Sequence, residues 1–319
     1  MDGIINVYKE KGFTSFDVVA KLRGILEIKK IGHTGTLDPN AEGVLPVCIG
    51  SATKLCDMLT DKSKEYRAVM RLGVVTDTQD MTGEVLRTGK VPEDEACIRQ
   101  AALSFVGEYD QMPPMYSALK VNGQKLCDLA RQGKVVERAR RRVTIHELAI
   151  TQMELPLVTM QVHCSKGTYI RTLCQDIGEK LGCGGCMQSL VRTRVSGFTL
   201  DRANTLAQIE RFRDEGRLDE LILPVETVFL SLAPMRVRAG AQRFLDNGNP
   251  VRVEQTAFMT ERVTECAAEQ TGRTGRGRLT DGERVRMYHS DGRFCGVYAY
   301  HEQERMLKPV KIFFLGKRR

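Results

Sequence analysis

The most informative stretch of this 319-residue chain reads Gly32-His33-Thr34-Gly35-Thr36-Leu37-Asp38-Pro39. Asp38 is its one acidic residue, among glycines, hydroxyl side chains and apolar residues. The two glycines around Thr34 permit backbone conformations that other residues resist, and Pro39 pushes Asp38 toward an extended or turn geometry. A carboxylate on a rigid turn beside an apolar segment is a candidate catalytic group, although an ordinary Asp-Pro turn would look the same.

Four further blocks accompany this stretch and its extension to Lys54. They are Asp77-Thr78-Gln79-Asp80, Pro114-Met115-Tyr116-Ser117-Ala118-Leu119-Lys120, His163-Cys164-Ser165-Lys166-Gly167-Thr168-Tyr169-Ile170-Arg171-Thr172-Leu173 and Leu190-Val191-Arg192-Thr193-Arg194. Together the blocks closely resemble the TruB-type tRNA pseudouridine synthases, in that family's order and spacing across most of residues 1–232. Asn40 and Glu42 depart from the family's pattern, which has an apolar residue and a threonine at these positions.

The resemblance implies an α+β fold, with a mixed, antiparallel-rich central sheet and flanking helices. It also implies an activity: isomerisation of uridine to pseudouridine at position 55 in the T arm of tRNA, by base flipping and a catalytic aspartate. This reaction breaks the N1–C1′ bond, turns the base and rejoins it through C5, so it needs no cofactor. It does need a carboxylate, a water-poor pocket and access to a stacked base.

Asp38 matches the family's aspartate, and the sequence leaves open whether it attacks the sugar, attacks the base or removes a ribose proton. Arg171 matches the cation that keeps this carboxylate ionised, although a surface arginine on a helix is the alternative. Tyr66 matches a residue that stacks on the flipped uracil, a contact worth roughly 1–3 kcal/mol, although a tyrosine on a strand is often core. These three residues form the predicted catalytic set.

The same matches predict further substrate contacts. His33 is expected to position loop bases and not to act as an acid or base, and Leu190 to form an apolar pocket wall, which core packing would resemble. The remaining predicted contacts are Lys54, Asp80 and Tyr169.

Net charge is distributed unevenly along the chain. Residues 233–319 carry 17 Lys and Arg against 10 Asp and Glu, which gives +7 of the total +8. A basic appendage on a nearly neutral body indicates a module that holds nucleic acid, although a tail made basic for solubility has the same composition. We therefore expect a catalytic domain over 1–232 and an RNA-binding domain over 233–319. Its short strands and Asp-Gly turns resemble the β-barrel-like PUA domain, and residues 271–278 form a basic loop.

Local patterns predict the elements that position the site. A strand is expected over 4–8, a helix capped by Ser15, strands over 66–72 and 157–164, and a helix that starts near Ile170 and ends at Gly182. Residues 112–142 are expected to form an insertion that projects from the sheet and carries arginines at a basic tip, with a solvated charged loop as the alternative.

Cysteine usage and hydropathy bound the environment. The ten cysteines lie in a chain too long for a disulfide scaffold, and no stretch of 18 apolar residues is present. We expect a cytoplasmic protein with reduced thiols and no membrane contact. Cys183 and Cys186 have the spacing of zinc ligands, but a structural zinc ion needs four ligands, so no metal is predicted.

The predicted partner is tRNA, bound by a monomer without an obligate protein partner. A non-catalytic tRNA-binding protein or folding chaperone is an alternative, and the intact set of Asp38, Tyr66 and Arg171 argues against it. An RNA-guided synthase of the dyskerin type is another, and the chain lacks the long Lys-rich tail expected there.

Overall fold

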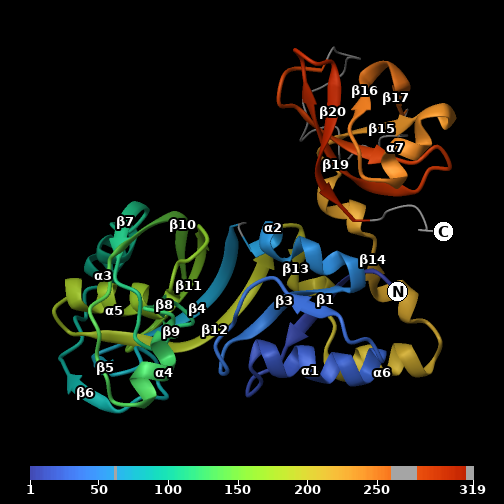
Figure 1. The fold of residues 1–319 in the computed structure, drawn as a ribbon. Helices are drawn as coiled ribbons and strands as arrows, with labels where there is room; N and C mark the ends of the chain where they lie inside the picture. The colour runs from blue at the N-terminus through green and yellow to red at the C-terminus, as the bar shows by residue number, and fades with distance from the viewer. Residues whose placement is uncertain (61–62, 260–278, 314–319) are drawn as a thin grey trace. The chain divides into compact units, whose positions relative to one another are not determined.

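The computed structural model describes residues 1–60, 63–259 and 279–313, so the basic loop at 271–278 lies outside the described residues. The chain forms two compact units, drawn as a ribbon in Figure 1. The larger unit comprises Asn6–Val47 and Leu55–Leu221. The other comprises Met1–Ile5, Cys48–Lys54 and residues 222–319. The last boundary between the two units therefore falls between residues 221 and 222. The functional domains at 1–232 and 233–319 stay a prediction.

The main sheet has the strand order β14-β1-β3-β12-β4-β11-β10-β7 in the described part of the chain, with β13 beside β12 and β2 beside β3. Strands β12, β4, β11, β10 and β7 pair antiparallel, whereas β3 and β12 run parallel, so the sheet is mixed and antiparallel-rich as expected. The strands are β1 (Gly3–Lys9), β2 (Ile31–His33), β3 (Glu42–Ile49), β4 (Lys64–Leu72), β7 (Gly107–Gln111), β10 (Arg141–Glu154), β11 (Leu157–Cys164), β12 (Gly185–Val195), β13 (Phe198–Thr199) and β14 (Ile222–Leu223).

Strand β4 shows why these residues form a sheet with one covered face. Ala68, Met70 and Leu72 are buried, whereas Arg67 is exposed and the intervening Val69 and Arg71 are only partly buried. This alternation places every second side chain against the helices, and the same core includes Met160 of β11. The predicted strands over 66–72 and 157–164 are therefore confirmed.

Helices cover the larger unit of Figure 1. They are α1 (Ser15–Leu26), α2 (Cys56–Thr60), α3 (Glu95–Leu103), α4 (Leu126–Arg131), α5 (Ile170–Lys180) and α6 (Leu206–Asp214). The N-cap of α1 is Thr14, whose hydroxyl accepts from the Asp17 N–H in a capping box, so the prediction of Ser15 as the cap is wrong by one residue. None of the helices in the described ranges is long and apolar enough to cross a membrane.

The expected insertion contains α4 and the two-stranded sheet of β8 (Lys120–Val121) and β9 (Gln124–Lys125). Its arginines are not at a tip. Arg142 lies in β10, where its side chain pairs with Glu108 and Asp110 of β7, and Arg140 donates to the Asp110 carbonyl. Acidic residues at the edge strand thus draw the arginines to the base of the insertion, and the prediction of a basic tip is wrong. A second small sheet, β5 (Val74–Thr76) with β6 (Val85–Thr88), follows β4.

The smaller unit contains a six-stranded, nearly closed barrel-like sheet of order β16-β20-β19-β18-β15-β17, as expected for a PUA-like fold. Its core includes Met235, Leu245, Val285 and Tyr298. The elements are β15 (Ala233–Val237), α7 (Gln242–Asp246), β16 (Val251–Arg252), β17 (Thr256–Phe258), β18 (Arg284–Tyr288), β19 (Phe294–His301) and β20 (Met306–Ile312).

Candidate active site

An ion pair between Asp38 and Arg171 forms the centre of the candidate site. Arg171 Nε lies 2.9 Å from Asp38 Oδ2, and Arg171 Nη2 lies 3.1 Å from Asp38 Oδ1, so the pair is bidentate. The Arg171 side chain is 5% exposed and that of Asp38 is 36% exposed. The guanidinium also donates to the carbonyls of Thr78 and Tyr116, at 3.1 and 2.7 Å. The arginine is therefore fixed, while the carboxylate keeps an open side.

The turn that carries Asp38 is held by two side chains from β1 and α1. Lys9 is fully buried, and its ammonium group donates to the carbonyls of Pro39 and Ala41. Burial lowers the pKa of Lys9 to about 8. Ser15, which does not cap α1, accepts instead from the Leu37 N–H through its hydroxyl oxygen at 2.9 Å. Both sides of Asp38 are thus fastened to rigid elements.

Arg192 of β12 holds the glycine-rich approach to Asp38. This buried guanidinium donates to the carbonyls of Val44 and Gly35, at 2.8 and 3.3 Å. Its own backbone passes Gly43 so closely that a Cβ at position 43 would lie 2.3 Å from the Arg192 carbonyl oxygen. Gly43 also has a φ of +104°, which favours glycine. The glycine is therefore required for β3 and β12 to meet beside the site.

Two opposing effects set the charge of Asp38. Removal from water raises the pKa of this carboxyl, and the nearby Asp80 raises it further, whereas the Arg171 charge lowers it. Burial is the largest effect, so the pKa of Asp38 lies above its ordinary value. A carboxylate with a raised pKa is a stronger base and nucleophile than a solvated one.

Two tyrosines lie close to this pair. Tyr66 of β4 is half-buried opposite Arg192 of β12, and burial raises its pKa to about 12, so its phenol is neutral. Tyr169 precedes α5 as its N-cap, and burial raises its pKa as well. Tyr66 packs against the core that contains Leu37 and Ala41, on either side of Asp38, and Tyr169 lies two residues before Arg171.

Asp80 lies in a turn and His33 at the end of β2. Asp80 Oδ1 accepts from the Thr78 hydroxyl at 2.8 Å and from the Thr82 N–H at 2.9 Å, which leaves the Asp80 side chain engaged within its own turn. His33 ends β2, and its Nδ1 accepts from the Gly35 N–H at 3.3 Å. Burial lowers the pKa of His33 and so favours the neutral ring, consistent with a positioning role.

Lys54 belongs to the smaller unit, whereas Asp38 belongs to the larger one. The Lys54 ammonium group donates to the Ile312 carbonyl at 2.8 Å, and both residues belong to the smaller unit. Leu190 is 6% exposed and packs in the core that also contains Leu37 and Ala41. Leu190 is thus part of the packed core that also includes the residues on either side of Asp38, as the core alternative describes.

A shallow cavity nearby does not contain the ion pair. Tyr66 borders it, but most of its lining comes from polar side chains on neighbouring strands, among them Glu65, Arg67, Gln161 and His163. Glu65 and Arg67 alternate with Tyr66 along β4 and therefore face the opposite side of the sheet.

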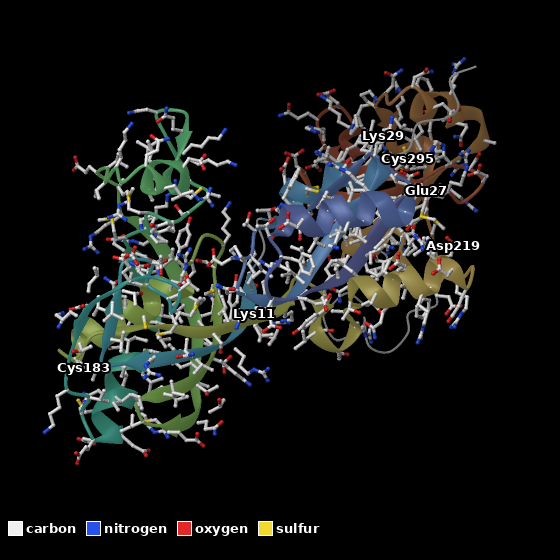
Figure 2. All side chains as sticks on the ribbon, turned by 90° about the horizontal axis from the view of Figure 1, so that it is seen from below. Lys11, Glu27, Lys29, Cys183, Asp219 and Cys295 are labelled. Carbon is white, nitrogen blue, oxygen red and sulfur yellow. The ribbon has the colours of Figure 1, made fainter. Side chains whose placement is uncertain are left out.

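Cys183 and Cys186, which have zinc-ligand spacing, face different neighbours. Cys183 Sγ lies 3.3 Å from the Gly184 carbonyl oxygen, and Cys186 Sγ lies 3.4 Å from Met81 Sδ. Figure 2 shows Cys183 far from Lys11, which follows β1 near the Asp38 turn. Among the residues that the structure describes, no group of three or more His, Cys, Asp or Glu side chains is arranged to hold a metal ion.

Sequence reasoning missed the residues that hold the site. Lys9 had one signal, a charged residue directly after the apolar run at 4–8, and Arg192 lay inside a recognised block without an assigned role. The carbonyls of Thr78 and Tyr116 carry no side-chain signal at all. Backbone acceptors of this kind emerge only when the chain is folded.

The fold and the site together define a class: an enzyme with a mixed sheet, a carboxylate on a turn paired with a buried guanidinium from a helix, and a small barrel-like unit. Two family models match the chain. TruB family pseudouridylate synthase (N terminal domain) matches residues 23–170, and tRNA pseudouridylate synthase B C-terminal domain matches residues 171–230.

Curated relatives match over nearly the whole chain. A tRNA pseudouridine synthase B from Lachnoclostridium phytofermentans is 52% identical, over 98% of this chain and all of its own length. A tRNA pseudouridine synthase B from Burkholderia pseudomallei is 42% identical, over 99% of this chain and 98% of its own. The protein therefore belongs to the TruB family of pseudouridylate synthases.

Solved structures support the same fold. A chain of a Cbf5-Nop10-Gar1 complex has a TM-score of 0.70 and 27% identity, with 98% of this chain and 85% of that chain covered. A chain of an H/ACA RNP bound to a substrate RNA containing 2′-deoxyuridine has a TM-score of 0.69 and 25% identity, with the same coverage.

Proposed function

We propose that this protein converts uridine 55 in the T arm of tRNA to pseudouridine, with Asp38 as the catalytic carboxylate. Relatives that are 42–52% identical over nearly the whole chain are tRNA pseudouridine synthases B. The observation that supports the assignment to Asp38 is its bidentate pairing with the buried Arg171, which leaves one side of a partly desolvated carboxylate open.

Each neighbour has a role in this proposal. Arg171 keeps Asp38 ionised and aimed, and Tyr66 stacks on the flipped uracil as a neutral phenol. Tyr169 and Asp80 contact the substrate around the carboxylate, and His33 positions bases of the loop. Lys54 belongs to the smaller unit and contacts RNA there.

The protein acts as a cytoplasmic monomer without a guide RNA in this proposal. The test is incubation of the purified protein alone with an unmodified tRNA transcript, followed by mapping of pseudouridine. Product at position 55, and none when that uridine is replaced by cytidine, is the expected result. Product that requires added guide RNA or protein would favour an RNA-guided synthase, and binding without product would favour a tRNA chaperone.

A further inference from the structure

Gln111, the last residue of β7, contacts one residue of the candidate site, Tyr169. Its side chain is 1% exposed. Gln111 Oε1 accepts from the Tyr169 N–H at 2.7 Å, and Gln111 Nε2 donates to the Tyr169 carbonyl at 3.0 Å. The Gln111 amide therefore forms hydrogen bonds with both the backbone N–H and the carbonyl of Tyr169, which lies 58 positions later in the chain.

These two hydrogen bonds lie at the start of α5, a helix that its own N-cap side chain does not cap. Tyr169 is the N-cap residue and makes no side-chain cap hydrogen bond. Its carbonyl accepts from Leu173 as the first helical bond, at 3.0 Å. A buried N–H left unpaired is destabilising, so Gln111 supplies from β7 the partner that the local sequence lacks.

The orientation of the Gln111 amide is fixed as well. Its Nε2 also donates to the Tyr109 hydroxyl. Burial raises the pKa of Tyr109, so this hydroxyl stays protonated and available as an acceptor. The amide nitrogen thus has two acceptors and the amide oxygen one donor, and a flipped amide would lose both bonds to the Tyr169 backbone.

The start of α5 matters because two candidate site residues leave the backbone there. Tyr169 precedes the helix, and Arg171 is its second residue. The insertion begins directly after Gln111, and its first carbonyl, that of Met112, accepts from the Thr172 hydroxyl at 3.3 Å. A shift at Gln111 would therefore displace the phenol and the guanidinium together.

We propose that Gln111 is a positioning residue of the pseudouridine synthase reaction. By clamping Tyr169 from β7, it fixes the entry of α5 and thereby the placement of Tyr169 and Arg171 around Asp38. This inference rests on the proposed function. Because Gln111 is buried and touches no substrate, it acts on the chemical step and not on tRNA affinity.

The first test compares Gln111→Met with the parent on an unmodified tRNA transcript. Methionine matches the length of glutamine and removes every hydrogen bond. We expect kcat to fall about tenfold or more with KM changed less than about threefold, because small misplacements of catalytic groups reduce the chemical step strongly. The matched control is Gln100→Met, at an exposed position of α3, which should leave kcat and KM unchanged.

The second test is Gln111→Glu, which separates positioning from stability by its pH dependence. A protonated glutamate has an acceptor and a donor where the amide has them, whereas an ionised one turns an acceptor toward the Tyr169 carbonyl. Burial raises the pKa of a carboxyl, so the protonated form recovers as the pH is lowered. We expect the ratio of the Gln111→Glu kcat to the parent kcat to rise as the pH falls from about 8 to about 6.

The outcomes separate the inference from the function beneath it. A parent without turnover would contradict the proposed function and the inference with it. An active parent whose Gln111→Met variant keeps kcat within twofold would overturn the inference alone, even if the melting temperature fell. If Gln111→Met does not fold, Gln111→Glu decides: a kcat ratio near one at every pH would overturn the inference.

Discussion

The ion pair between Asp38 and Arg171 joins a partly exposed carboxylate to a buried guanidinium. The carboxylate keeps about a third of its surface open, while Arg171 is enclosed and bound to two backbone carbonyls besides Asp38. A buried cation beside an anion with one open side suits a reaction in which the carboxylate must contact a substrate atom. The pair is preorganised, since backbone carbonyls hold the guanidinium while Lys9 and Ser15 hold the turn that carries Asp38.

Replacement of Asp38 by asparagine should abolish turnover and leave tRNA binding largely intact. Asparagine keeps the size of the side chain but supplies neither the nucleophile nor the base, while most affinity comes from phosphate and stacking contacts. Single-turnover assays and a filter-binding titration measure the two properties. Turnover above one per cent of the parent would contradict the assignment of Asp38.

The pH dependence of the parent should reflect the raised pKa of Asp38. The reacting form is the carboxylate, so kcat/KM should fall as the pH drops through a midpoint above the ordinary aspartate value. Arg171→Gln removes the charge that lowers this pKa, so its acidic limb should lie at still higher pH, with a lower kcat. Circular dichroism at each pH excludes acid unfolding as the cause. An acidic limb at or below the ordinary aspartate value would be inconsistent with a desolvated Asp38.

At the scale of elements, the pattern of apolar residues predicted those strands and helices that depend on residues near one another in the sequence. The alternation in β4 and the spacing in α5 are properties of neighbouring residues, and both elements appear where the pattern predicted them. The prediction that the arginines at 138–142 form a basic tip was wrong because the acidic partners of Arg142 lie in β7, about 30 positions away in the sequence. The pairing of Asp38 with Arg171 spans 133 positions and came from family resemblance, since no spacing rule reaches so far.

Gly43→Ala tests the close passage between β3 and β12. The new Cβ would meet the Arg192 carbonyl, and the left-handed backbone adds strain, so we expect a loss of about 1–3 kcal/mol or more in unfolding free energy. Activity should fall too, because Arg192 holds Gly35 beside the site. The control is Gly216→Ala, which has a φ of +69° but open space around its Cβ. Denaturant titrations that give both variants the same loss would show that the close contact has no cost.

At the scale of the whole molecule, the excess positive charge lies in the segment that forms the barrel-like sheet. The strands of the barrel-like sheet begin with β15 at Ala233, and residues 233–319 carry +7 of the net +8. The residues proposed to surround Asp38 all precede this point in the sequence. Sequence composition can predict a separation of this kind because charge and turn content are properties of whole segments, and the functional boundary at 232/233 stays a prediction.

Deletion of residues 233–319 should weaken tRNA binding and flatten its salt dependence while retaining some turnover. Each lost phosphate contact reduces the slope of log affinity against log salt by roughly 0.9 on duplex nucleic acid. The truncated chain keeps β14, which pairs with β1 through Ile4 and Ile5, so the edge of the main sheet stays covered. Circular dichroism must first show that it folds, because the chain loses the acceptor of the Lys54 ammonium group. A folded truncation with unchanged affinity and salt slope would show that the smaller unit does not hold RNA, and that its positive charge serves solubility instead.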